Sequence, residues 1–145
     1  MPAPKDDPVG IPDETRLFRR IDPSWITPDK NRGEWRPTSQ NFQDSKDGTP
    51  MSVFAENVAN ANGELPSAFV REGGLWAGWY LAAITAGWMR ELGQAVYLDP
   101  ANQDPNDIYQ SHAAVEGPKD NKTRSKISSK YEWVIPPLNR YDLPD

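Results

Sequence analysis

The chain has 145 residues, the length of one domain, and 37% of them are hydrophobic, which allows a single modest core. Its net charge of −5 argues against unspecific attraction to nucleic acid or to a membrane surface. The absence of cysteine excludes disulfides, thiolate zinc sites and cysteine nucleophiles. With 15 prolines and 10 glycines, the sequence predicts short elements joined by many loops.

The first 14 residues are rich in proline and acidic side chains and contain no apolar stretch of the kind found in signal peptides. We expect residues 1–14 to form a flexible or extended arm, followed by one domain over residues 15–145. The longest uncharged apolar stretch, Leu75 to Met89, is shorter than the roughly 20 residues that a membrane-spanning helix needs. The sequence therefore predicts a soluble, cytoplasmic protein without a membrane partner.

Three elements are expected before residue 62. They are a strand over Thr15–Ile21, a strand entered through Gly48–Phe54, and a short helical turn over Ala55–Ala61. The stretch Asp22–Phe42 contains three prolines, so we expect a long irregular loop there, and such a loop in a compact domain is often functional.

The segment Gly73–Pro100 is the most apolar part of the chain and predicts the core. A strand over Trp79–Ile84 is expected to lead into a helix over Ala86–Leu92 and a strand over Gln94–Leu98. Thr85 is placed to cap the start of this helix, and Gly93 to end it. A single helix over 75–92 is the alternative. The predicted core residues are Trp79, Leu81, Ile84, Met89, Leu92, Val96 and Leu98.

Later in the chain we expect a strand over Ile108–Val115 and a basic helix over Asn121–Trp133, whose inward side would carry Ile127, Tyr131 and Val134. Prolines argue against regular structure after Trp133. The predicted fold class is α+β: a single compact domain with a small, largely antiparallel sheet, one or two short helices and long wrapped loops.

His112 is the only histidine, and so the only side chain expected to titrate near neutral pH. It could act as a general acid or base, but we favour a structural histidine bonded to backbone groups with no cavity beside it. The sequence has no G-x-S-x-G, no phosphate-binding glycine loop and no calcium-loop spacing in DPANQDPND around Asp99, Asp104 and Asp107. We therefore predict no metal site and no cofactor.

Two groups of basic residues contrast with the acidic total. The first comprises Arg16, Arg19, Arg20, Arg32 and Arg36; the second comprises Lys119, Lys122, Arg124, Lys126 and Lys130. Interleaved with Phe18, Trp25 and Trp35, the first group could bind phosphate and stack bases, although a solvated surface is the commoner meaning of such groups. Nucleic acid therefore stays open as a partner.

Six tryptophans form a further pattern. Trp76, Trp79, Trp88 and Trp133 are predicted to lie in the core. Trp25 and Trp35 lie in polar, proline-rich sequence, where they either pack the long loop onto the core or serve as exposed anchors for a partner.

Five phrases of the sequence occur together: LFRRI, RPTSQNF, MSVF, TAGWMRELGQAVYLDP and HAAVEGPK. As a set they resemble a family of small uncharacterised bacterial proteins. In that family an arginine-bearing strand is followed by R-P-[ST]-S-x-x-F, a Ser-Val strand, [VR]-x-L-G-x-x-V-x-x-D-P and a His before G-x-K. The resemblance covers about Leu17–Lys119 and departs near Gly117–Lys119, where an Asp-Asn insertion lengthens the turn. It implies a bacterial origin and one compact domain, but no reaction.

Two functions of different classes are open. The first, which we favour because no catalytic motif is present, is a non-catalytic accessory module of a bacterial multi-protein complex, for example of a toxin–antitoxin or defence operon. Its protein partner would contact Trp25, Trp35, Arg32 and Arg36. The alternative is a small enzyme acting on a nucleotide or nucleic acid, loosely analogous to ADP-ribosyltransferases. Its catalytic residues would be Arg19, Ser39 and His112.

Overall fold

A computed structural model describes residues 10–71, 73–103 and 108–137. The strands are β1 (Arg16–Ile21), β2 (Ile26–Asp29), β3 (Glu34–Pro37), β4 (Met51–Ala55), β5 (Tyr80–Thr85), β6 (Ala95–Leu98), β7 (His112–Glu116) and β8 (Glu132–Ile135). The helices are α1 (Glu56–Ala61), α2 (Ala86–Glu91) and α3 (Asn121–Ser128), with single 3₁₀ turns η1 (Ser39–Asn41) and η2 (Pro66–Val70). The predicted α+β class is confirmed.

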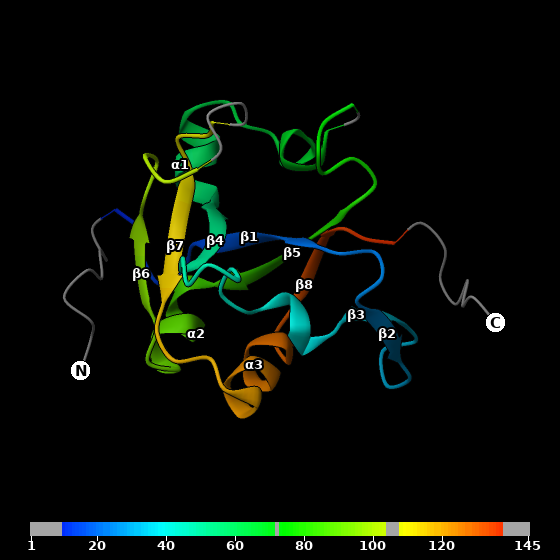
Figure 1. Cartoon of the computed structure of the whole chain (residues 1–145). Helices are drawn as coiled ribbons and strands as arrows, with labels where there is room; N and C mark the ends of the chain where they lie inside the picture. Colours follow the sequence, from blue (N-terminus) through cyan, green and yellow to red (C-terminus); the bar gives the residue numbers. More distant parts are fainter. Residues whose placement is uncertain (1–9, 72, 104–107, 138–145) are drawn as a thin grey trace.

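The main sheet of the described chain has six strands in the order β6-β7-β4-β1-β5-β8, and every neighbouring pair is antiparallel (Figure 1). β1 pairs with β5 along its whole length, from Arg16 opposite Thr85 to Ile21 opposite Tyr80. Its pairing with β4 is much shorter, because only Leu17 and Phe18 have partners there. The central strand is thus fully bonded on one side and mostly unbonded on the other.

Side chains alternate between two apolar clusters, one on each face of the sheet, as the two-residue period of a strand requires. Leu17 and Ile21 of β1 belong to the larger cluster, which α2 and α3 cover with Met89 and Ile127. Phe18 belongs to the smaller cluster on the opposite face, a group of buried residues made of Phe18, Phe54, Ala59, Phe69, Leu81, Ala83 and Tyr109.

Both short helices that carry a recognisable N-cap begin as the local sequence predicts. The Thr85 side chain accepts a hydrogen bond from the Trp88 amide at the start of α2, and Asp120 accepts one from the Thr123 amide at the start of α3. Gly93 follows α2 with a positive φ of 81°, a conformation that a side chain would disfavour. The strand–helix–strand prediction for this region is confirmed, and the single helix over 75–92 is wrong.

The predictions for residues 22–42 and for the stretch from residue 121 to residue 135 need correction. The stretch Asp22–Phe42 is not wholly irregular, because β2 and β3 pair as a hairpin with Pro28 opposite Trp35; prolines are tolerated in so short a two-stranded element. The basic helix ends at Ser128, and Trp133 and Val134 lie instead on β8, which pairs with β5 at the edge of the sheet. An edge strand of this kind needs few partners, which is why the prolines that follow did not prevent it.

The Gly73–Pro100 segment is core only from β5 onward. Leu81, Ile84, Met89 and Val96 are buried as predicted, whereas Leu92 and Leu98 are half-buried. Residues 73–79 form a turn-rich surface loop in which Leu75 is 77% exposed and Trp79 is half-buried. Apolar composition alone did not distinguish this loop from the strand after it.

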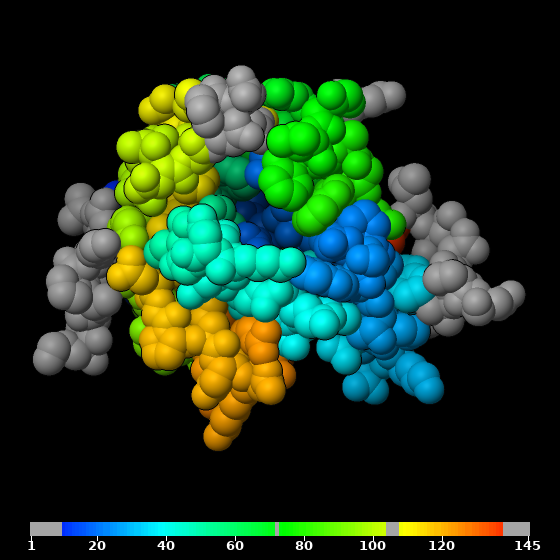
Figure 2. All heavy atoms as spheres, in the orientation of Figure 1, coloured from blue at the N-terminus to red at the C-terminus, as the bar shows by residue number. Residues whose placement is uncertain are grey.

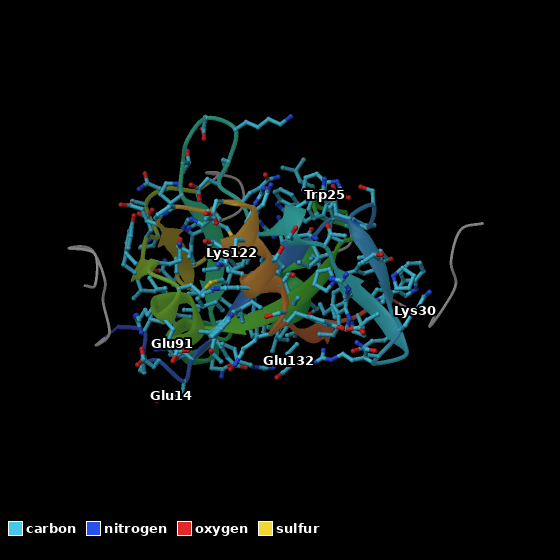
Figure 3. All side chains as sticks on the ribbon, turned by 90° about the horizontal axis from the view of Figure 1, so that it is seen from below. Glu14, Trp25, Lys30, Glu91, Lys122 and Glu132 are labelled. Atoms are coloured by element: carbon cyan, nitrogen blue, oxygen red, sulfur yellow. The ribbon has the colours of Figure 1, made fainter. Side chains whose placement is uncertain are left out.

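The end of the predicted N-terminal arm packs on the domain. Ile11 is fully buried in the larger cluster, and the Asp13 carbonyl accepts a hydrogen bond from the Gly87 amide of α2. In Figure 3, Glu14 and Glu91 accordingly lie at the same end of the molecule. Residues 1–9 and 138–145 lie outside the described residues. Within the described ranges, none of the helices combines the length and the apolar character needed to cross a bilayer.

We predict that Ile84→Ala lowers the free energy of unfolding by about 2–5 kcal/mol, because it empties a buried position on the fully paired side of the sheet. Leu75→Ala, from the same apolar segment, should change it by less than about 0.5 kcal/mol because Leu75 is exposed. Urea unfolding of both variants gives the comparison. Equal losses would contradict the division of this segment into loop and core.

Candidate binding pocket

A cavity of about 300 Å³ opens on the face of the sheet that carries the smaller cluster. Its walls come from β1, β4 and β7, from residues 22–45, from the loop after η2 and from Gln103. Figure 2 shows the hollow, with the dark blue of β1 at its floor, the turquoise chain near residue 45 on one side and the green chain near residue 75 on another. The lining residues are Arg19, Arg20, Trp25, Asn41, Ser45, Ser52, Phe54, Trp76, Trp79, Gln103 and His112.

Two consecutive arginines of β1 both reach this cavity, although neighbouring strand residues normally face opposite ways. The short pairing of β1 with β4 explains it. Beyond Phe18 the two strands separate, and the Arg19 side chain occupies the gap, where Nη1 donates to the Ser52 carbonyl at 2.8 Å and Nε to the Asn41 carbonyl at 2.9 Å. Arg20 reaches the same cavity over the face of the sheet.

The Arg19 residue is half-buried, and its guanidinium has no carboxylate partner among the described residues. Burial lowers its pKa to about 10, helped by the charge of Arg20, while the charge of Asp44 acts in the opposite direction. A guanidinium with this pKa still carries its charge at neutral pH. Its Nη2 has no hydrogen-bond partner in the described part of the chain, and Arg19 lines the cavity, so the group can receive an anion.

Arg20 is held in a stack of aromatic rings. Its guanidinium carbon lies 4.7 Å from the centre of the Phe54 ring and 4.5 Å from that of the Trp76 ring, and its Nε donates to the Phe69 carbonyl at 2.6 Å. Phe54 in turn stacks on Phe69 with ring centres 4.2 Å apart. Arginine sandwiched in this way loses little freedom when it binds an anion, because the rings already fix its plane.

Trp25 and Trp79 complete the aromatic walls, and both are half-buried. Trp79 meets Trp76 edge to face, at 84° between the ring planes. The Trp25 ring makes no aromatic or cation contact with the residues that the structure describes. These two indoles are therefore the walls against which a flat ligand can lie.

Asn41 fixes the segment that carries Trp25. Its side-chain amide donates to the carbonyls of Trp25 and Thr38, at 2.8 Å and 3.0 Å, and its side-chain oxygen accepts from the Asp22 amide at 3.1 Å. The Asn41 carbonyl also accepts a hydrogen bond from Arg19. This one buried residue therefore connects the segment of Trp25, a wall of the cavity, to β1 at its floor. The sequence analysis missed Asn41, since a buried asparagine in a loop has no local signature.

His112 lies on β7 opposite Phe54, and its ring lines the cavity. Its Nδ1 is 2.6 Å from the Asp99 carbonyl oxygen, which can only accept, so Nδ1 carries the hydrogen. We expected a histidine bonded to backbone with no cavity beside it. The bond to backbone is present, but the absence of a cavity is wrong, because strand pairing places His112 on the same face as Arg20 and Phe54.

The structure brings together only part of each predicted set of site residues. Arg19 and His112 share the cavity, whereas Ser39 lies on η1 and does not line it. The serines of the lining are Ser45 and Ser52. Trp25 lines the cavity, but Trp35 is 7% exposed and its carbonyl accepts from the Trp133 indole, so as an exposed anchor it is wrong. Trp76 and Trp79, predicted as core, are cavity walls.

The remaining basic residues lie elsewhere. Arg32 stacks on Tyr131, 4.5 Å from the ring centre, and Arg36 lies on β3. Figure 3 shows Lys30 at the tip of the hairpin formed by β2 and β3. Lys122 and Lys126 are exposed on α3, which covers the opposite face of the sheet. The second basic group is thus no single surface, because the Lys119 side chain is buried against Asp44 with an Nζ–Oδ1 distance of 2.6 Å.

In comparisons with known proteins, no family model, curated protein or solved structure matches the chain. The resemblance to a bacterial family therefore stays a prediction. Among the described residues, no three histidine or acidic side chains are grouped to hold a metal ion. Asp104 and Asp107 lie outside these residues.

The Lys119–Asp44 pair lies next to the lining of the cavity, because Asp44 directly precedes Ser45. The Asp44 carboxylate also accepts a hydrogen bond from the Met51 amide at the start of β4. Burial lowers the pKa of the Lys119 amine, and the bond to Asp44 opposes this. We predict that Asp44→Asn lowers the free energy of unfolding by about 1–3 kcal/mol, because the Lys119 amine is buried and loses its charged partner, although the Asp44 side chain is 38% exposed.

Glu132→Gln is the matched control for that variant. It makes the same change of acid to amide in the Arg16–Glu132 pair, where the Glu132 side chain is 62% exposed and Arg16 keeps Glu56 as a partner (Figure 3). We expect a loss below about 1 kcal/mol in urea unfolding. A similarly small loss for Asp44→Asn would mean that the Lys119–Asp44 pair does not stabilise this wall of the cavity.

Proposed function

We propose that the protein binds a nucleotide in this cavity, with the phosphate on the guanidinium groups of Arg19 and Arg20 and the base against the indole rings of Trp25 and Trp79. One observation carries the proposal: two arginines from adjacent positions of one strand meet four aromatic side chains in a single cavity. Cations alone would suit any anion, and aromatic walls alone would suit any flat molecule. Their combination suits an anion joined to a planar ring.

The size of the cavity supports a small ligand. About 300 Å³ lies at the lower end of the range for small-molecule pockets, so a mononucleotide fits better than a longer nucleic acid. The charge of the whole protein supports the same choice, because a net charge of −5 would repel a polyanion while leaving a local pair of arginines effective.

The proposed ligand is the nucleotide expected for the alternative function as a small enzyme, but no reaction is assigned. Ser39 lies outside the cavity, so the predicted catalytic set of Arg19, Ser39 and His112 is not assembled. The accessory-module function loses one of its two tryptophan anchors, since Trp35 is buried. A protein of this kind could still serve a bacterial complex as the subunit that senses a nucleotide, and its location in the cytoplasm is part of the same proposal.

The test compares adenosine 5′-monophosphate with adenosine and with inorganic phosphate. We expect the nucleotide to bind at least about 10-fold more tightly than either part, because charge-assisted hydrogen bonds and base stacking each contribute more than 1 kcal/mol. Isothermal calorimetry gives the affinities. Tryptophan fluorescence gives a second readout, because three of the six tryptophans line the cavity.

Two variants locate the binding. Trp79→Leu should weaken nucleotide binding about 5- to 100-fold by removing a stacking surface, and Lys122→Ala should change it by less than about 2-fold. Lys122 is the control for charge, because it is exposed on α3 across the sheet from the cavity. Equal binding of adenosine and its monophosphate, or a loss in Lys122→Ala as large as in Trp79→Leu, would refute the proposal.

A further inference from the structure

His112 presents a hydrogen-bond acceptor to the cavity. The two arginines of the lining, Arg19 and Arg20, present only donors. The Asp99 carbonyl fixes the hydrogen on Nδ1, so in the neutral ring Nε2 carries a lone pair. Nε2 has no hydrogen-bond partner among residues 10–71, 73–103 and 108–137, and His112 lines the cavity although the residue is only 4% exposed. Nε2 is not one of the fully buried unpaired side-chain atoms, so it is accessible from the cavity and can accept a hydrogen bond from a ligand that supplies a donor.

The backbone holds this arrangement rigidly. The Asp99 amide donates to the His112 carbonyl at 2.9 Å, so β6 and β7 are joined at Asp99 both through the backbone and through the imidazole ring. The ring also meets Phe54 edge to face, with centres 5.9 Å apart. Rotation of the ring to exchange its nitrogens would break the bond to Asp99, so the cavity keeps an acceptor at this position.

We infer that His112 is a specificity-determining residue that selects nucleotides carrying a free sugar hydroxyl, through donation of that hydroxyl to Nε2. This rests on the proposed nucleotide binding and deepens it. A doubly charged phosphate placed at Nε2 would set oxygen lone pairs against the nitrogen lone pair. The phosphate therefore belongs at the arginines, and a hydroxyl of the same ligand belongs at His112. A ligand without that hydroxyl offers no donor to this nitrogen in the cavity.

The first test compares ligands on the unaltered protein at pH 8. Adenosine 5′-monophosphate should bind about 3- to 10-fold more tightly than its 2′,3′-dideoxy analogue, the usual effect of one hydrogen bond. The two monodeoxy analogues show which hydroxyl is responsible. Equal binding of the ribose and dideoxy nucleotides would overturn the inference while leaving the proposed function intact. Binding of neither would refute the proposed function itself.

The second test removes the acceptor and keeps the structural bond. In His112→Asn the shorter amide can still donate to the Asp99 carbonyl but offers nothing at the place of Nε2. We expect the ribose and dideoxy nucleotides to bind this variant within about 2-fold of each other. His112→Gln, whose longer amide can place an oxygen near that position, should recover part of the preference. If the role of His112 were purely structural, its replacement would lower the affinities for the ribose and dideoxy nucleotides by the same factor and leave their ratio unchanged.

A third measurement needs no variant. Because His112 is the only histidine, labelling with ¹⁵N-histidine gives signals from this ring alone. We expect the free protein to show the form protonated on Nδ1, and the signal of the unprotonated nitrogen to shift with the ribose nucleotide and much less with the dideoxy one. A ring protonated on Nε2 in the free protein, or equal shifts with both ligands, would overturn the inference.

Discussion

The structure depends on the place where β1 and β4 stop pairing and the Arg19 side chain supplies hydrogen bonds in place of the backbone. After Phe18, the strands no longer exchange backbone hydrogen bonds, and the guanidinium of Arg19 bonds the Ser52 and Asn41 carbonyls instead. An open gap in the middle of a sheet would leave backbone groups without partners at considerable cost. Arginine fits this gap because its several donors lie in one plane at fixed angles.

The cavity forms at the same place, because the Arg19 side chain lies where β1 and β4 no longer pair. A sheet paired along all of β1 and β4 would close the floor at this point and turn Arg19 toward the opposite face. Because the strands separate, a charged group stands in the plane of the sheet, and Arg20 stands above it. The desolvation that lowers the pKa of Arg19 also leaves its charge weakly screened, so the group that bridges the strands is well suited to attract an anion.

Around this floor, rigid and irregular parts of the chain have different roles. The strands β1, β4 and β7 hold Arg20, Phe54 and His112 through the register of their pairing. The tryptophans come from connecting segments that are tied back by hydrogen bonds, as Asn41 ties the carbonyl of Trp25. Polar groups of a site placed on strands are well oriented, and walls placed on loops can adjust to the ligand.

Periodicity and local chemistry determined much of the fold in advance. The sequence indicated β1, β5, β6, α2 with its cap at Thr85, and the α+β class, because alternation, capping and a following glycine are properties of neighbouring residues. Where local evidence is ambiguous, it does not predict the structure: the prolines of residues 22–42 argue against the β2–β3 hairpin that forms, and the apolar composition before β5 predicts core where the chain is a surface loop. The sequence also identified His112 and the arginines of β1 as unusual, though not what they would do together.

Only the tertiary structure decided the site. Arg19, His112 and Trp76 are distant in sequence, and their meeting follows from strand order and from the gap between β1 and β4, which no local pattern specifies. The burial of Trp35 and the exposure of Leu75 likewise depend on which other segments cover them. Residue types and short-range spacing fix what each segment can form. Long-range pairing, whose partners lie tens of residues away, fixes which side chains share a cavity.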